Sequence, residues 1–391
     1  FKGLAIEQLE KEWKQYPVLH FSLSTAKMGT IEDLFNQINM QLKRMERLYG
    51  QNRDGDDVTT RFSNLVTNLY DKTGKQVVVL IDEYDAPLLT VLHDPQRLEP
   101  MRTALQSFYS PLKDLDPYLR FVFITGISKF SQLSIFSQLN NLYNISMLPK
   151  YAALCGITQQ ELEDNFQEGI RGLAQNLECS KDEVLQKLRR QYDGYHFAAK
   201  SPGVYNPFSL LNTFDKQEFG SYWFETGTPT YLVELLKRNH YNLEEMAHAE
   251  TYADVLNSIY GDEDPLPVIF QSGYLTIKSY DKEFGLYRLG FPNREVEEGF
   301  AKFLIPFYTR FSKIEAPFEI QKFVQEIRRG QPEAFLKRLQ GFFADTPYEL
   351  VSDLELHYQN VLFIIFKLVG FYTQAEYHTS EGRIDLVVKA P

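Results

Sequence analysis

Two adjacent carboxylates that follow an apolar run are the sharpest chemical signal in this sequence. The segment reads VVVLIDEYD, so the run Gln76–Ile81 leads directly into Asp82 and Glu83. An unbroken β-branched run of this length is typical of a strand buried on both faces of a parallel sheet. Ligands of open α/β sheets bind at the carboxyl ends of the strands, which is where these acids would lie. The plainer alternative is a strand that ends in solvent-facing acids.

The acid pair has the form of a Walker B element. In P-loop ATPases the first acid, here Asp82, holds Mg²⁺, and the second, here Glu83, polarises the attacking water. A second strand-like run, RFVFIT, ends in Thr125 and is followed by Gly126. This pattern fits a sensor strand beside the Walker B strand, whose polar side chain reads the γ-phosphate. The alternative for Thr125 is an ordinary strand end with a turn glycine.

The phosphate-binding loop that such a site needs is missing from the sequence. No GxxxxGK[ST] occurs, so the chain has no backbone cradle and no phosphate-binding lysine of that motif. Since this loop follows the first strand in P-loop ATPases, we expect it upstream of Phe1. The chain also starts without Met in a helix-like segment and ends at Pro391 just after a strand-like run. We therefore expect both ends to be cut from a longer protein.

Two further acids near the C-terminus could share a metal ion. Glu355 lies in the apolar helical run Tyr348–Leu368, and Asp385 lies in the strand-like run GRIDLVV. Packing of the apolar helix face against the strand would bring both carboxylates into a common cleft, close enough to share one ion. Two carboxylates repel each other without a cation. The alternative is that Glu355 is a surface acid and that Asp385 pairs with Arg383.

The first part of the chain alternates predicted strands and helices, the pattern of an α/β domain with a parallel sheet. We also expect the strands ending at Asp82–Glu83 and at Thr125 to be parallel neighbours. The predicted strands are Pro17–Ser24, Gln76–Ile81 and Leu119–Thr125. The predicted helices are Thr30–Tyr49, Arg61–Tyr70 and Arg102–Tyr109. The apolar residues of the first helix lie on one face, and they are Ile31, Leu34, Ile38, Leu42, Met45 and Leu48.

The rest of the chain is predicted to be mainly helical. Capping boxes open helices at Thr158–Glu161 and Ser180–Glu183. Helical patterns also cover Thr230–Asn239, Tyr252–Ile259, Asn293–Phe311, Ile320–Phe343 and Tyr348–Leu368. Strand pairs are predicted at Pro267–Lys278 with Phe284–Phe291, and at Tyr372–His378 with Arg383–Lys389.

Composition excludes several classes of protein. Lys+Arg is 41 and Asp+Glu is 52, giving a net charge of −11, which argues against a general nucleic-acid coat but not against a local basic groove. With 2 Cys and no HxH or HExxH, the sequence offers no disulfide framework and no Cys- or His-built metal centre. No apolar run of membrane-spanning length and no signal peptide is visible, so we expect a cytoplasmic protein without membrane contact.

Several motifs together resemble one bacterial family. The segments VVVLIDEYDAPL, FVFITGISKFSQLSIFSQLNNL, QYDGYHF, YNPFSLLN and YWFETGTPTYLV are similar to those of the AAA-ATPase-like family, and the resemblance covers essentially the whole chain. It implies an N-terminal P-loop domain and a C-terminal PD-(D/E)XK nuclease-like domain. In such nucleases, a helix acid, a strand acid and an ExK on the next strand surround Mg²⁺. The ExK would fall past Pro391, so we expect no metal at Glu355 and Asp385 without it.

These observations predict an α/β fold in three parts. They are a P-loop NTPase-like parallel-sheet domain lacking its Walker A (1–157), a helical and winged-helix-like middle region (158–318), and a partial PD-(D/E)XK nuclease-like domain (319–391). The predicted function is that of an ATP- and Mg²⁺-binding ATPase coupled to a nuclease-like domain that acts on nucleic acid. The alternative is a catalytically inactive, nucleotide-gated scaffold or interaction protein.

Overall fold

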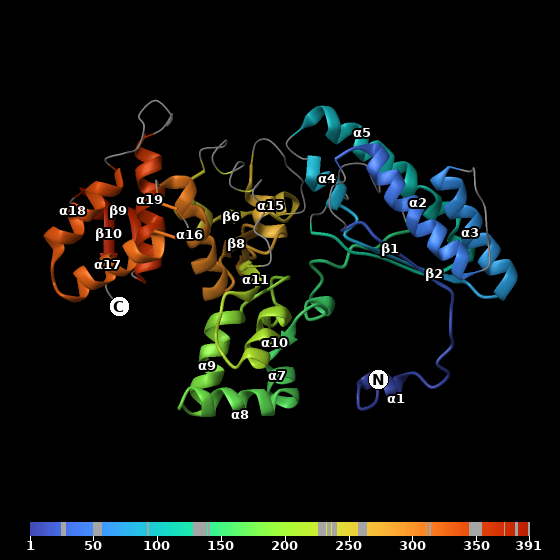
Figure 1. Cartoon of the computed structure of the whole chain (residues 1–391), viewed down its shortest axis with the longest axis horizontal. Coiled ribbons are helices and arrows are strands. Elements are labelled where there is room, and N and C mark those ends of the chain that lie inside the picture. The colour runs from blue at the N-terminus through green and yellow to red at the C-terminus, as the bar shows by residue number, and fades with distance from the viewer. Residues whose placement is uncertain are drawn as a thin grey trace. The chain divides into compact units, whose positions relative to one another are not determined.

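The computed structural model divides the chain into two compact units, Phe1–Tyr143 and Asn144–Pro391. Each unit is described by itself (Figure 1). The structure describes residues 1–24, 29–49, 57–91, 94–127, 139, 141–225, 232, 236, 241–256, 264–309, 311–312, 314–343, 354–370, 372–379 and 382–389, the last two ranges by their backbone.

A parallel sheet of three strands organises the first unit. Its strands are β1 (Val18–Ser22), β2 (Val77–Asp82) and β3 (Leu119–Ile124), in the order β1-β2-β3. The register places Ser22 beside Asp82 and Ile81 beside Ile124. The prediction that the strand ending in the acid pair lies parallel to and directly beside the strand leading to Thr125 is confirmed.

Helices cover one face of this sheet (Figure 1). The three long ones are α2 (Ile31–Leu48), α3 (Val58–Thr73) and α5 (Pro95–Tyr109), accompanied by the short helices α4 (Ala86–Val91), α6 (Pro111–Asp114) and η1 (Asp116–Tyr118). The short helix α1 (Ala5–Leu9) lies outside this layer and buries none of its residues. The side chains of Thr30 and Asp57 cap α2 and α3 at their N-termini, and Gly74 ends α3 in the left-handed conformation, with φ 63°. The rings of Phe21, Phe62 and Phe108 meet under the helices.

The opposite sheet face carries exposed or half-buried apolar side chains, which corrects the prediction that β2 is buried on both faces. Side chains alternate along a strand, and Val77, Val79 and Ile81 face the helices and are buried. Val78 and Leu80 point the other way and are only half-buried. Phe121, in register with Val78, is 54% exposed, and its ring stacks on Phe123. The residues that the structure describes bury the helix-facing side chains of β1 and β2, and they leave this opposite face open.

The predicted buried face of α2 is partly wrong at its C-terminal end. Leu48 is 74% exposed. Glu46 is buried, because it forms an ion pair with Arg61 of α3. The guanidinium donates to both Glu46 oxygens, at 3.0 and 2.7 Å, and to Asn39 Oδ1. A paired and hydrogen-bonded charge can be buried where a lone one cannot, so Arg61 accounts for a buried acid that periodicity alone would not place there.

The second unit begins with a helical cluster. It contains η3 (Pro149–Tyr151), α7 (Gln159–Asn165), α8 (Gln167–Asn176), α9 (Lys181–Tyr192) and α10 (Pro207–Lys216), with a small pairing of β4 (Ile157–Thr158) and β5 (Val204–Tyr205). Both predicted capping boxes are present, from Thr158 to Glu161 and from Ser180 to Glu183. Their two reciprocal hydrogen bonds explain why α7 and α9 begin where they do.

An antiparallel three-stranded sheet follows among short helices. The elements are α11 (Tyr222–Glu225), α13 (Leu243–Ala247), β6 (Glu250–Thr251), α14 (Ala253–Leu256), α15 (Leu266–Gln271), β7 (Thr276–Asp281) and β8 (Leu286–Gly290). The strand order is β6-β8-β7. The strand predicted to begin at Pro267 begins only at Thr276. The prediction is wrong for the preceding apolar run, because that run forms the buried helix α15. Most of Thr230–Asn239, and residues 257–259 of the helix predicted to end at Ile259, lie outside the described residues.

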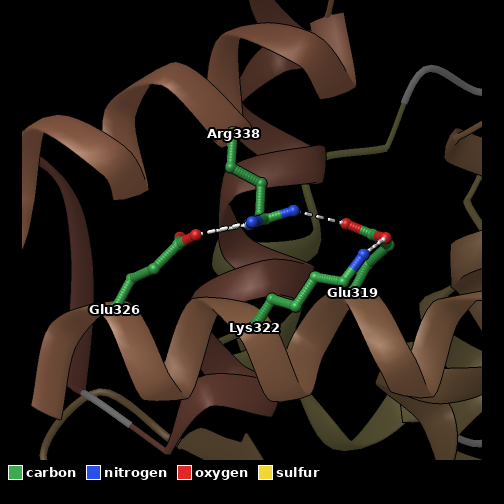
Figure 2. A network of polar contacts seen from close by, with 4 residues as sticks. All are labelled: Glu319, Lys322, Glu326 and Arg338. Atoms are coloured by element: carbon green, nitrogen blue, oxygen red, sulfur yellow. Dashed lines mark hydrogen bonds and ion pairs between the residues drawn. The ribbon is translucent and has the colours of Figure 1, made fainter. Parts of the chain in front are cut away.

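Among the described residues, the rest of the unit consists of the helices α16 (Arg294–Tyr308), α17 (Ala316–Arg328), α18 (Pro332–Phe343) and α19 (Leu354–Val369) and of a hairpin of β9 (Tyr372–Thr379) and β10 (Gly382–Lys389). The predicted helical stretch Ile320–Phe343 is broken in two, because Gly330 adopts φ 64° and Pro332 opens the next helix. Arg338 of α18 bridges Glu319 and Glu326 of α17, and Lys322 also binds Glu319 (Figure 2). The start of the helix predicted from Tyr348 lies outside the described residues.

Candidate functional site at the carboxyl edge of the parallel sheet

Asp82 and Thr125 meet where β2 and β3 end. The Thr125 hydroxyl donates a hydrogen bond of 2.6 Å to Asp82 Oδ1, and the Thr125 amide donates to the carbonyl of Ile81 at 2.9 Å. Asp82 itself is solvent-exposed. The parallel register brings the two chain ends to one edge, so residues 43 positions apart in sequence share one polar site.

Glu83 follows in an unusual backbone conformation. Its φ is 52°, in the left-handed region that disfavours a side chain with a Cβ, and such strain gathers at functional sites. Its carboxylate has no hydrogen-bond partner among the described residues. Burial raises the pKa of the Glu83 carboxyl, and the nearby carboxylates of Asp82 and Asp85 raise it further. A half-buried, unengaged carboxylate with a raised pKa is suited to take up a proton.

Ser22 is a part of this edge that the sequence interpretation missed. It lies beside Asp82 in the sheet register, and its hydroxyl is 2.8 Å from that of Ser24. The Gln41 side chain of α2 holds the Ser22 backbone by two hydrogen bonds of 2.8 Å. The signal was available, because serines alternate with Leu23 at the end of the first strand. Polar side chains therefore end the three strands at one edge.

The oxygen donors at this edge fit a hard divalent cation. Asp82 offers an exposed carboxylate, and among the described residues only its Oδ1 has a hydrogen-bond partner. Carboxylate and hydroxyl oxygens with water are the ligands that Mg²⁺ takes in proteins. Within the described ranges no cluster of three or more His, Cys, Asp or Glu could enclose a metal by itself.

The C-terminal acids are placed only by their elements. Glu355 is exposed in the first turn of α19. Asp385 lies in β10 between the register pairs Ile384–Tyr377 and Leu386–Ala375, and so across from Glu376 of β9. The antiparallel hairpin was predicted and is confirmed. The Asp385 side chain lies outside the described part of the structure, so the shared cleft stays a prediction.

Motifs left without a role by the sequence meet around a buried acid in the second unit. Glu295 of α16 is 0% exposed and accepts hydrogen bonds from Ser209 Oγ at 2.7 Å and from the Trp223 amide at 2.9 Å. Ser209 belongs to YNPFS and Trp223 to YWFE. A Cβ on Gly194 of YDGYHF, with φ 103°, would come within 2.3 Å of the Pro292 carbonyl. These contacts give the three motifs a packing role.

The fold and this edge define an α/β protein with an acid pair at a ligand-binding position, and comparisons with known proteins agree. The family described as "Predicted AAA-ATPase" matches residues 1–136, and the PD-(D/E)XK nuclease superfamily matches residues 353–391. No solved structure matches the chain. Within the described residues, no helix is both long and apolar enough to cross a membrane.

The chain belongs to the predicted AAA-ATPase family and carries a C-terminal segment of the PD-(D/E)XK nuclease superfamily. A curated relative is the "Uncharacterized protein in vnfD 5'region" of Azotobacter chroococcum mcd 1. It is 33% identical to this chain over 401 residues, which cover 99% of this chain and 74% of the relative. The family resemblance inferred from the motifs is therefore confirmed, by the family matches at residues 1–136 and 353–391.

Proposed function

We propose that the protein is an AAA-type ATPase that binds ATP and Mg²⁺ and is coupled to a nuclease-like domain acting on nucleic acid. The observation that carries the proposal is the grouping of Asp82, Glu83 and Thr125 at one sheet edge. The family membership supports it independently. We expect the protein to act in the cytoplasm of a bacterium.

Each residue of the edge has a role in this proposal. Asp82 would hold Mg²⁺, which when bound neutralises charge that develops on phosphate oxygens. Thr125 orients the Asp82 carboxylate through its 2.6 Å hydrogen bond and places a hydroxyl where a terminal phosphate could be read. Glu83, with its raised pKa, would take the proton of the attacking water. The 391 residues contain no GxxxxGK[ST], so they supply the metal and water side of the site and not the phosphate cradle.

The test uses the longest reading frame that contains these residues together with a GxxxxGK[ST] loop. We expect Mg²⁺-dependent ATP hydrolysis that Asp82→Ala and Glu83→Gln each lower about 100-fold or more in kcat, in the range of lost acid–base catalysis. Asp114→Asn, an exposed acid of α6, is the matched control and should leave the rate unchanged. Turnover that survives both site variants would overturn the assignment.

The nuclease-like part of the proposal rests on the C-terminal segment. Glu355 and Asp385 would bind Mg²⁺ together with an ExK, and no ExK follows Asp385 in this sequence. The activity is therefore tested on a longer reading frame that includes an ExK, with single- and double-stranded DNA and RNA as substrates. Metal-dependent cleavage that is lost in Asp385→Ala supports the proposal. Cleavage unaffected by that variant contradicts it.

We also propose that α13 to β8 form a winged-helix-like module that does not read nucleic acid. The order helix, strand, two helices, two strands, with β8 central, supports the module. A recognition helix must expose one face to a groove of the nucleic acid. In α15, however, Leu266–Phe270 is buried. The hairpin tip carries Asp281 and Glu283 beside one Lys282, which disfavours phosphate contact. Nucleic-acid contact is therefore assigned to the nuclease-like segment.

A second candidate is a nucleotide-gated scaffold that no longer reacts. It differs from the ATPase in carrying degenerate versions of the GxxxxGK[ST] and ExK motifs, which the family resemblance places outside the 391 residues. A longer reading frame that carries degenerate versions of both motifs, and that binds a partner protein without turnover, would decide for the scaffold.

A further inference from the structure

The turns after β2 and β3 are joined by more than the bond between Asp82 and Thr125. The amide of Tyr84 donates to the carbonyl of Thr125 at 2.9 Å, and the amide of Ile127 donates to Asp85 Oδ1 at 3.1 Å. Asp85 is 0% exposed. Backbone and side-chain bonds thus connect the two turns on both sides of Gly126.

The two turns also touch directly at Gly126. A Cβ at this position would lie 2.5 Å from Asp85 Oδ1 and 2.5 Å from the ring of Tyr84. Real Cβ atoms do not approach other heavy atoms so closely, so a side chain here would force the turns apart. Glycine is required because the backbone after Thr125 packs directly on the buried carboxylate.

Asp85 is itself fixed to a helix. Its carbonyl accepts from the amides of Leu88 and Leu89 at 2.9 and 3.0 Å, so Asp85 starts the first turn of α4. The carbonyl of Glu83 similarly accepts from the amide of Ala86 at 3.1 Å. Since the Glu83 carboxylate has no hydrogen-bond partner among the described residues, its place is set by the backbone on either side of it.

We propose that Asp85 is a positioning residue whose buried carboxylate locks the turn carrying Glu83 to the turn Thr125–Ile127. The lock would keep the Glu83 carboxylate in a fixed relation to the Thr125 hydroxyl. The importance of this lock for catalysis rests on the function proposed above. The existence of the lock does not depend on that function. Asp85 also adds negative charge beside Glu83, which contributes to the raised pKa of that carboxyl after burial and Asp82.

The first test measures amide hydrogen exchange in the chain without nucleotide. Asp85→Ala should speed exchange at the Ile127 amide about tenfold, as expected when one hydrogen bond to a charged group is lost. Asp85→Asn keeps an acceptor oxygen and should leave that amide protected. Gly126→Ala should expose the amide without altering any carboxylate. Asp114→Asn is the matched control. Unchanged exchange at Ile127 in both Asp85→Ala and Gly126→Ala would overturn the proposal.

The second test separates positioning from mere stability. Exchange is compared at the Tyr84 amide, which donates to the Thr125 carbonyl between the same two turns, and at the Gly74 amide, which bonds to Tyr70 at the end of α3. Asp85→Ala should speed exchange at Tyr84 and leave Gly74 unchanged, and Asp114→Asn should change neither. Equal acceleration at both amides would overturn the positioning role, because it would show a general loss of stability. Neither measurement needs ATP, so absent turnover would count against the proposed function alone.

Discussion

The Thr125 hydroxyl lies 2.6 Å from Asp82 Oδ1 and thereby ties together the ends of two parallel strands. Thr125→Val keeps the shape of the side chain and removes its donor. We expect the free energy of unfolding to fall by about 1 kcal/mol. A double-mutant cycle with Asp82→Ala, followed by urea denaturation, should show a coupling energy of similar size. Thr90→Val, which removes a hydroxyl within α4, serves as the control outside this pair.

Glu83 should be more valuable for chemistry than for stability. Glu83→Asn places a residue that tolerates the left-handed region at φ 52°, and it removes a disfavoured charge. We expect the protein to gain about 0.5–1 kcal/mol at neutral pH. Glu178→Asn, at another left-handed glutamate with φ 50°, reports the backbone contribution for comparison. A loss of stability in Glu83→Asn would contradict the strain argument.

The Glu83 effect should depend on pH in a defined direction. Because the folded pKa is raised, the wild-type protein gains stability as pH falls from above that raised pKa into the ordinary range of carboxyl groups. The advantage of Glu83→Asn should therefore shrink on acidification, leaving the backbone part. Thermal unfolding of both proteins at pH 7 and at about pH 4, near the ordinary carboxyl pKa, measures it. A stability gain of Glu83→Asn that grows at low pH would contradict the raised pKa of Glu83.

The helix pair α17–α18 should depend on Arg338. Burial alone would raise the pKa of Glu319, but hydrogen bonds from Lys322 and Arg338 outweigh it and lower that pKa. Arg338→Ala should cost about 1 kcal/mol, at the upper end for exposed pairs because several charges form a network. The contribution is present above the ordinary carboxyl pKa and is lost as pH falls through the lowered value. Arg288→Ala, which breaks an exposed pair with Glu250, should cost less.

Glu295 should be the most costly acid to remove from the second unit. Glu295→Ala removes the buried acceptor of the Ser209 hydroxyl and leaves the Trp223 amide with only its longer bond of 3.3 Å to Ser209 Oγ. We expect a loss of about 3 kcal/mol, and about 1–2 kcal/mol for Ser209→Ala. Glu298→Ala, on the same helix in a surface pair with Arg294, should stay within about 0.5 kcal/mol. Equal effects of Glu295→Ala and Glu298→Ala on chemical denaturation would contradict the packing role.

The 391 residues themselves should not hydrolyse ATP at an enzyme-like rate. Asp82 and Glu83 supply metal affinity and a base, but no backbone cradle holds the β- and γ-phosphates. A steady-state assay with Mg²⁺ should stay at the background rate. Mg²⁺-dependent turnover that Asp82→Ala abolishes would refute this expectation.

The edge site was predictable where its signal is local. A β-branched run that stops at two acids marks both the strand and its chemical end, and the polar Thr125 marks the neighbouring strand in the same way. Asp85 gave no such signal, because its burial depends on Ile127 and Gly126 folding over it. A residue two positions from a predicted catalytic acid is therefore understood only when the next strand is in place.

Errors of fold prediction arose where tertiary contacts override local pattern. Apolar residues at 267–270 fit a buried strand or a buried helix equally, and Pro267 at the helix start decides for the helix. Periodicity predicts one helix over Ile320–Phe343, but the left-handed conformation of Gly330 ends the first helix and separates it from the second. The apolar run of β2 predicts side chains buried on both faces of the sheet. In the structure, only the side chains of Val77, Val79 and Ile81 are buried against helices.

The sheet face that the described residues leave open should also affect how copies of the chain behave in a crowded solution. Phe121 and Phe123 stack there beside half-buried Val78 and Leu80, which water wets poorly. At low ionic strength a net charge of −11 keeps neighbouring molecules apart. Added salt limits that repulsion to a range of about 10 Å at 0.1 M, so that the aromatic rings of two molecules can meet. Solubility should therefore fall as salt rises, and purification in dilute buffer should yield the better-dispersed sample.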